Sequence, residues 1–168
     1  MKIIVIFDME CNFFLNGIIA ISKDVEIIKL SINNKSTRIV EMINNNTPFV
    51  VITHGRYRPF YLTGSTIFFV STCVTASELY DILYKRMTQN EARISPREIL
   101  VIRKTLNGDS ELKISQDIGV TIKTVSTHKS NIRKKTTIKS LKDMTCVFGF
   151  IINQEIFESL HAHHQDHI

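Results

Sequence analysis

The sequence has few cysteines and no long apolar run, and these two shortages exclude several classes of protein. Cys11, Cys73 and Cys146 are odd in number, far apart and outside any paired motif, so we expect neither a disulfide framework nor a zinc site. No apolar stretch approaches the roughly 20 residues that span a bilayer. The apolar opening, residues 2–7, is too short for a signal peptide and is followed at once by acidic residues. These features predict a cytoplasmic protein without a membrane partner.

Acidic residues are also scarce in one part of the chain. Residues 95–145 contain 11 lysines and arginines against 5 aspartates and glutamates, and no carboxylate occurs from Ile122 to Leu141. Such a local positive field suits a polyanion, either nucleic acid or an anionic membrane face. A basic helix that is merely solvated is the alternative explanation.

The first ninety residues alternate between apolar β-branched runs and amphipathic segments. Continuous apolar runs are typical of strands buried on both faces, and a spacing near 3.6 is typical of helices. Strands are expected at 2–7, 25–31, 49–53 and 66–72, and helices at 11–22, 36–46 and 76–87. This alternation predicts an α/β domain over residues 1–88, in which helices cover a parallel sheet. A polar linker is expected at 89–94.

The chain beyond the linker is expected to be an all-α domain of four helices over residues 95–160, followed by a His-rich tail at 161–168. Its start signal is strong. Ser95 can cap the first helix, Pro96 is tolerated at the first helical position, and Glu98 can close a capping box onto Ser95. The four helices are expected at 95–107, 109–120, 121–135 and 140–160.

The third of these helices is the basic one, and its two sides differ in character. Its apolar residues fall on the side that docks on the preceding helices, and these are Ile122, Val125 and Ile132. Cations and short hydroxyls fall on the other side, and these are Lys123, Thr127, Ser130 and Lys134. Short polar side chains approach base edges closely, while lysine and arginine reach phosphates. A short helix, a turn containing Gly119 and this second helix therefore predict a helix-turn-helix that enters the major groove.

Four short motifs within Ser95–Met144 closely resemble the LuxR/FixJ/GerE-type DNA-binding domain. The family's Thr/Ser-Pro-Arg-Glu start is present, as are most of its Gly-x-Ser-x-x-x-Ile-Ala element, its Leu-Gly-Ile-Ser-x-x-Thr-Val core and its His-basic-x-Asn-Ile segment. The positions that carry the resemblance are Ser95, Pro96, Arg97, Glu98, Gly108, Ser110, Ile114, Ile118, Gly119, Val120, Thr121, Thr124, Val125, His128, Lys129, Asn131 and Ile132. Ser115 departs from the family's alanine.

This resemblance implies sequence-specific binding to double-stranded DNA as a dimer. No cofactor and no metal are predicted. It assigns base contacts to Ser126, Thr127 and Ser130, and phosphate contacts to Lys123, His128, Lys129, Arg133 and Lys134. Many members carry lysine directly after the Thr-Val pair, where this chain has Ser126, and serine reads bases less discriminatingly. The segment is nearer to the RcsA- and GadE-like auxiliary regulators of enteric bacteria than to typical members. Packing under the helix is the alternative role for His128.

The fourth helix, at 140–160, has more apolar surface than a three-helix core needs. A surplus of that kind usually marks an interface. In the resembling family this helix pairs two subunits, so the contacts here would be Met144, Phe148 and Ile152. The expected partner is a second copy or a related response regulator, which gives a homodimer or a heterodimer.

Residues 2–18 resemble the start of a response-regulator receiver domain, in which acidic residues after the first strand help to hold Mg²⁺. Asp8 and Glu10 occupy that neighbourhood. The phosphoacceptor aspartate should end the third strand, yet this strand runs into Thr53 and His54, and a fifth strand with its lysine is not evident. Phosphoryl transfer has no acceptor without a nucleophilic carboxylate. We therefore expect a degenerate receiver-like domain that is not controlled by aspartyl phosphorylation.

No enzyme is expected, because no nucleophile and base are convincingly placed together. Histidines in the tail have spacings that can chelate a transition metal, but a frayed terminus is the simpler explanation and no metal site is predicted. The predicted function is that of a dimeric DNA-binding transcription regulator. The competing hypothesis is an adaptor that modulates another response regulator without reading DNA itself.

Overall fold

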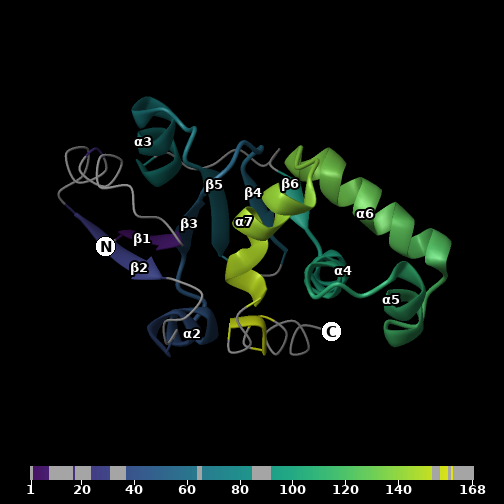
Figure 1. The fold of residues 1–168 in the computed structure, drawn as a ribbon. Helices are drawn as coiled ribbons and strands as arrows, with labels where there is room; N and C mark the ends of the chain where they lie inside the picture. The colour runs from purple at the N-terminus through teal and green to yellow at the C-terminus, as the bar shows by residue number, and fades with distance from the viewer. Residues whose placement is uncertain are drawn as a thin grey trace.

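The computed structural model describes residues 2–7, 17, 24–30, 37–63, 66–84, 92–152, 156–158 and 160. The helix expected at 11–22 lies outside this described part except for Gly17, which is helical. Asp8, Glu10 and the His-rich tail also lie outside the described residues. The described residues form one sheet and a set of helices that pack on its faces and beside its edge (Figure 1).

Six strands form the sheet, in the order β2-β1-β3-β5-β4-β6. Their bounds are Lys2–Phe7 for β1, Val25–Leu30 for β2, Phe49–Thr53 for β3, Phe60–Leu62 for β4, Ile67–Ser71 for β5 and Ala92–Ile94 for β6. The first three strands and β5 pair in parallel, whereas β4 runs antiparallel to β5 and parallel to β6. The four long strands are the four that the sequence predicts, so the α/β class with a parallel sheet is confirmed.

Two short strands were not expected. Phe60–Leu62 and Ala92–Ile94 have three residues each, too few to show the two-residue periodicity by which a strand is recognised. They pair with each other, with Phe60 opposite Ala92 and Leu62 opposite Ile94. The segment expected as a linker at 89–94 therefore ends in a strand of the sheet, and the helical region begins where that sheet edge stops.

The strand order shows which element stands in place of a fifth long parallel strand. The order 2-1-3, continued by β5, is the start of the doubly wound arrangement 2-1-3-4-5. The place of the last parallel strand is taken by β4, which precedes β5 in the chain and runs antiparallel to it. The sheet is thus receiver-like over four strands and differs at the edge that faces the C-terminal helices.

Helices cover the two faces of the sheet, and alternation along the strands supplies both cores. In β1, Ile3 and Val5 belong to one buried cluster and Ile4 and Ile6 to the other, as expected when successive side chains point to opposite faces. Helix α2 (Thr37–Asn44) packs on the first face and α3 (Ala76–Tyr84) on the second. Both helices were predicted from the sequence and are confirmed.

Four helices follow the sheet: α4 (Pro96–Leu106), α5 (Glu111–Asp117), α6 (Ile122–Thr136) and α7 (Leu141–Ile152). The predicted capping box is present at the start of α4. The Ser95 hydroxyl accepts from the Glu98 N–H, and the Glu98 carboxylate accepts from the Ser95 N–H at 2.8 Å. Gly108 follows the end of α4 with a φ of 84°, a left-handed conformation that glycine adopts without steric cost.

Helix α7 packs across one face of the sheet (Figure 1). The ring of Phe148 is fully buried, with its centroid 5.3 Å from that of Phe60 and 6.4 Å from that of Phe69. Phe150 adds contacts to Phe49 and Phe69. One continuous apolar cluster therefore includes residues from the sheet and from the helical region. The apolar surplus of this helix, expected to be exposed, is covered by the chain's own strands.

Candidate nucleic-acid interface

The turn between α5 and α6 has the geometry that a helix-turn-helix requires. Gly119 has a φ of 67°, and its N–H donates to the carbonyl of Gln116 at 3.4 Å. The Val120 N–H donates to the carbonyl of Ser115 at 3.0 Å. These two hydrogen bonds form a Schellman motif, which closes α5 and redirects the chain. Thr121 then caps α6, with its hydroxyl accepting from the Thr124 N–H at 3.2 Å.

The inner side of α6 is defined by residues of its middle and last turns. Val125 is fully buried and Ile132 is 1% exposed, as the sequence predicts. Ile122, expected on the same side, is 46% exposed, so that expectation is wrong. Ile122 is the first residue of the helix, and the side chains that pack begin one turn later at Val125. The last three turns of α6 therefore pack against the rest of the domain, and the first turn extends beyond it into solvent.

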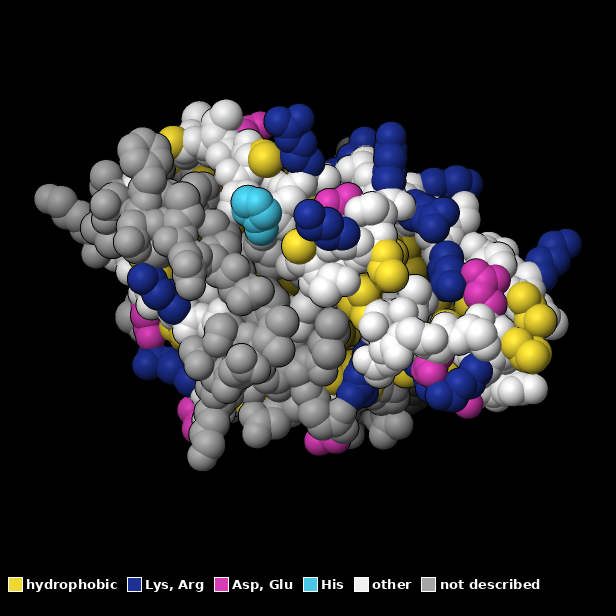
Figure 2. Space-filling model, in the orientation of Figure 1, with side chains coloured by type: hydrophobic (Ala, Val, Ile, Leu, Met, Phe, Trp, Pro, Cys, Tyr) yellow, Lys and Arg dark blue, Asp and Glu magenta, His cyan; other side chains and the backbone are white. Residues whose placement is uncertain are grey.

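The outer side of α6 is cationic and rich in hydroxyls. Six of the residues assigned to DNA contact are exposed there: Lys123, Ser126, Thr127, Ser130, Arg133 and Lys134. Lysine and arginine side chains gather over this helix in the space-filling view (Figure 2). The Thr127 hydroxyl donates to the carbonyl of Lys123 at 2.9 Å, which leaves its oxygen lone pairs directed outward for a further donor. The arrangement presents short polar groups between cations on a helix that is free on one side.

A carboxylate on α5 organises two of these residues. The Ser126 hydroxyl donates to Glu111 Oε2 at 2.7 Å, and Lys129 Nζ donates to Glu111 Oε1 at 3.0 Å. The hydrogen bond from Ser126, and then that from Lys129, lower the pKa of Glu111 below its ordinary value. Glu111 was not predicted as a site residue, because it lies 15 and 18 positions from its partners and on another helix. It fixes both side chains in the absence of DNA.

His128 is placed differently from its neighbours. Its side chain is half-buried, and Nε2 is enclosed with no hydrogen-bond partner among the described residues. A phosphate contact from His128 would therefore use Nδ1 or follow a rotation of the ring. The geometry agrees with the alternative assignment of this residue to packing beneath the helix.

The far end of α6 is tied to the start of α4 by an ion pair. Lys135 Nζ donates to both carboxylate oxygens of Glu98, at 2.8 and 2.7 Å. Glu98 is 2% exposed and also completes the capping box at Ser95. Removing one partner of such a pair leaves the other charge buried without compensation, which is costly. This contact fixes the angle at which α6 leaves the domain.

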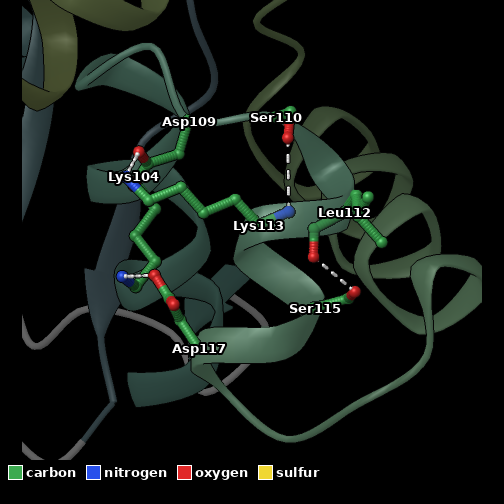
Figure 3. Close-up of polar contacts among 7 residues, drawn as sticks. All are labelled: Lys104, Asp109, Ser110, Leu112, Lys113, Ser115 and Asp117. Carbon is green, nitrogen blue, oxygen red and sulfur yellow. Dashed lines mark hydrogen bonds and ion pairs between the residues drawn. The ribbon is translucent and has the colours of Figure 1, made fainter.

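Helix α5 is held in place by contacts at both of its ends (Figure 3). Lys104 of α4 donates to Asp117, and Lys113 donates to Asp109 at 2.6 Å. The hydrogen bond from Lys104 lowers the pKa of Asp117, and the bond to Asp109 raises the pKa of Lys113. These contacts fix the short helix that supports α6.

Ser115, which replaces the family's alanine, is buried in α5. Its hydroxyl donates to the carbonyl of Leu112 at 2.7 Å (Figure 3). A buried hydroxyl costs little when it is hydrogen-bonded within its own helix. The departure from the family pattern is therefore accommodated without an unpaired polar group.

The carboxyl edge of the sheet, where a receiver holds its phosphoacceptor, contains hydroxyls. Thr53 ends β3, and its Oγ1 lies 2.8 Å from the phenol oxygen of Tyr57. Ser71, at the end of β5, donates to the carbonyl of Gly55 and accepts from the N–H of Cys73. Burial raises the pKa of Tyr57 well above its ordinary value. No acidic residue occurs in the sequence from Met42 to Ser77.

Two of the residues assigned to dimerisation are buried within the chain. Phe148 is fully buried and Met144 is 7% exposed, and both belong to the cluster shared with the sheet. The side chain of Ile152 lies outside the described residues. A subunit contact through Met144 and Phe148 would require α7 to leave the sheet.

Neither a metal site nor a membrane span is found in the described part of the chain. No cluster of three or more His, Cys, Asp or Glu side chains there has the arrangement of a metal site. None of the helices described is both long enough and apolar enough to cross a bilayer.

Comparison with known proteins identifies the helical region. Residues 92–148 match the family described as "Bacterial regulatory proteins, luxR family" (GerE). The match begins at β6 and includes α4, α5 and α6, so this region is a LuxR-family helix-turn-helix domain. It supports DNA binding and transcription regulation, and it supports the resemblance derived from the motifs.

A likeness to one solved structure extends over nearly the whole chain. The crystal structure of the response regulator ChrA, from a heme-sensing two-component system, is 12% identical over 98% of this chain and 97% of the other, with a TM-score of 0.28. A TM-score this low carries no argument about arrangement or function. No curated protein matches the chain.

Proposed function

We propose that the protein is a sequence-specific, cytoplasmic transcription regulator that binds duplex DNA through α6. The observation that carries this proposal is the exposure of Lys123, Thr127, Ser130 and Lys134 along one side of the second helix of a helix-turn-helix. In such motifs this helix enters the major groove with the residues of its first turns at the base edges. Thr127 and Ser130 then read bases, and Lys123 and Lys134 bind the phosphates on either wall.

Glu111 supports a defined role for Ser126 and Lys129. Because their contacts with Glu111 hold both side chains before DNA arrives, less rotamer freedom is lost when the complex forms. Ser126 keeps oxygen lone pairs for a base donor while its hydroxyl hydrogen is directed to Glu111. Lys129 contributes less to phosphate binding than Lys134, because its charge is already partly neutralised.

The proposal is tested by selecting bound duplexes from a random pool and measuring affinity against salt concentration. If a dimer neutralises roughly eight phosphates, the slope of log affinity against log salt is about −7. Lys134→Ala should weaken all duplexes alike, whereas Thr127→Ala should relax the preference at one base pair. Failure of the wild-type chain to enrich any sequence would contradict the proposal and favour an adaptor that modulates another response regulator.

We further propose that aspartyl phosphorylation does not control the protein. Thr53 and Ser71 stand at the strand ends, and the hydroxyl of each is engaged in a hydrogen bond within the sheet edge. Neither residue has the carboxylate that an acyl phosphate requires. Incubation with a small phosphodonor and Mg²⁺, followed by intact-mass measurement, should show no added phosphate. A gain of one phosphate would contradict this part of the proposal.

We also propose that two copies bind together, as a homodimer or with a related response regulator. Helix-turn-helix dimers read half-sites about one helical turn apart. Because Met144 and Phe148 are buried, the pairing surface in this conformation includes other residues, among which Leu141 is 59% exposed at the start of α7. The mass of the complex on a selected duplex, measured by light scattering, tests the stoichiometry.

A further inference from the structure

Two acid-free segments of the chain meet at the end of α6. No aspartate or glutamate occurs in residues 42–77 or in residues 122–142. The second segment includes α6, and the first includes the connection between β3 and β4, residues 54–59, here called the 54–59 loop. Positive charge from the loop is therefore not neutralised by neighbours in its own sequence.

Backbone hydrogen bonds fix the 54–59 loop against α6. The N–H of Arg58 donates to the carbonyl of Thr136, in the last turn of the helix, at 2.9 Å. The same N–H lies 3.3 Å from the hydroxyl of Thr137, the residue that ends the helix with a φ of 64°. The loop thus satisfies one of the carbonyls that a helix C-terminus leaves without an internal partner.

The loop is also anchored on its sheet side. Tyr57 is buried, with its phenol 2.8 Å from the Thr53 hydroxyl and its ring centroid 5.9 Å from that of Phe60. Gly55 has a φ of 126°, and a β-carbon there would lie 3.7 Å from the Val147 side chain of α7. Contacts with β3 and β4, and the hydrogen bond from the Ser71 hydroxyl of β5 to the Gly55 carbonyl, therefore hold the loop in one position.

This anchoring places two arginine side chains outside. Arg56 and Arg58 flank the buried Tyr57 in sequence, and both are exposed. Neither forms an ion pair with another of the described residues. In Figure 2, dark-blue side chains over α6 continue along the upper edge of the molecule toward the sheet. The cationic surface of the helix is thus extended by the α/β region.

The direction of α6 determines which part of a bound duplex the 54–59 loop would face. A recognition helix reads bases with its first turns, and its C-terminal end approaches the phosphate backbone. The 54–59 loop lies at that C-terminal end, in contact with Thr136 and Thr137. An arginine side chain spans several ångströms and binds phosphate through a planar fork of donors.

We propose that Arg56 and Arg58 of the α/β region bind DNA phosphates that flank the groove occupied by α6. The inference rests on the proposed DNA binding and adds a second contacting element, outside the LuxR-family domain. The contact is independent of base sequence, because it involves the backbone of the duplex alone. It lengthens the duplex that each copy needs for full affinity.

The side chains can be tested without disturbing the loop. The bond from the loop to the helix uses the Arg58 backbone N–H, so Arg58→Ala keeps it. The test variant is Arg56→Ala/Arg58→Ala, and the matched control is Lys29→Ala/Arg38→Ala. The control removes two positive charges from β2 and α2, and β2 is at the opposite edge of the sheet from β6. Because Arg38 is paired with Glu26, the melting temperature of the control is measured as well. Equal melting temperatures of wild type and test variant establish that folding is unchanged.

Binding is measured on two duplexes that share a site selected by the wild-type chain, one of 40 base pairs and one trimmed to the selected site. The test variant should show a salt slope shallower by about 0.9 for each lost phosphate contact, on the long duplex only. Its base preference should equal that of the wild type, and the control variant should match the wild type on both duplexes.

Two outcomes would overturn the inference, and they are distinguishable. A test variant with the wild-type salt slope on the long duplex, while Lys134→Ala still lowers that slope, would remove the loop from the interface and leave the proposed function intact. Absence of duplex binding by the wild-type chain would overturn the proposed function and this inference together.

Discussion

Lys135 of α6 and Glu98 of α4 form a two-pronged ion pair, with Nζ within 2.8 Å of both carboxylate oxygens. Glu98 is almost fully buried and also caps α4 through the Ser95 N–H. One carboxylate therefore caps the start of α4 and holds the last turn of α6 against it. The direction of α6 depends on this pair and on the Arg58 contact beside it.

Lys135→Met should lower the free energy of unfolding by about 2 kcal/mol, the range for hydrogen bonds to charged groups. The lysine is partly exposed, which keeps the loss below that of a fully buried pair. For a chain of this length the loss corresponds to a fall in Tm of about 4–8 °C. Lys139→Met is the control, because Lys139 is exposed and forms no ion pair with a described residue. Equal melting curves for the two variants would show that the Glu98 pair contributes no stability.

Glu111→Gln should increase affinity for every duplex, because the gain from a less neutralised Lys129 exceeds the rotamer freedom that the Glu111 contacts save. The substitution removes a negative charge beside the proposed DNA-binding surface and leaves Lys129 without an ion pair, so that its full charge can act on a phosphate. The salt slope should steepen by about 1, as expected for one additional phosphate contact. Glu41→Gln, on α2 and far from α6 (Figure 1), removes the same charge and should leave binding unchanged. Fluorescence anisotropy titrations at several salt concentrations measure both effects, and a decrease in affinity would instead show that Glu111 positions Ser126 productively.

The local features of the helical region were predictable because each depends on neighbouring residues. The Ser95 capping box, the Gly119 turn and the Thr121 cap are set within three or four positions of one another. The helical spacing of the apolar residues in α6 predicted its inner side, and Val125 and Ile132 are buried as expected. The four long strands followed from continuous apolar runs.

The features that the sequence did not reveal depend on how distant segments meet. Glu111 contacts α6 only because α5 crosses it, and no periodicity in α6 points to that carboxylate. The placement of Phe148 against the sheet depends on rings supplied by β4 and β5. An amphipathic helix shows how much apolar surface it has, but not whether strands or a second subunit covers it.

Two carboxylates of the helical region have lowered pKa values, and these give its stability a predictable dependence on pH. The pKa of Glu111 is lowered by Ser126 and Lys129, and that of Asp117 by Lys104. A group with a lowered pKa in the folded state contributes stability above its unfolded pKa, near 4, and this is lost as the pH falls through the folded value. Asp117→Asn should therefore narrow the difference in Tm between neutral and acidic pH. Asp24→Asn, at a residue that forms no ion pair with a described residue, should preserve that difference.

Phe148 joins the sheet and the helical region in one core, which predicts that they unfold together. Phe148→Ala removes a ring that contacts Phe60 and Phe69, and truncations of this kind cost about 3–5 kcal/mol. Leu141→Ala, on the same helix but exposed, should cost less than about 0.5 kcal/mol. Hydrogen exchange should show that protection falls in β3 and β5 of the Phe148 variant as well as in α4, because the shared cluster loses its centre. Loss of protection in α4 alone would mean that the two regions are independently stable and that α7 is free to leave the sheet, which would restore Met144 and Phe148 as candidate dimer contacts.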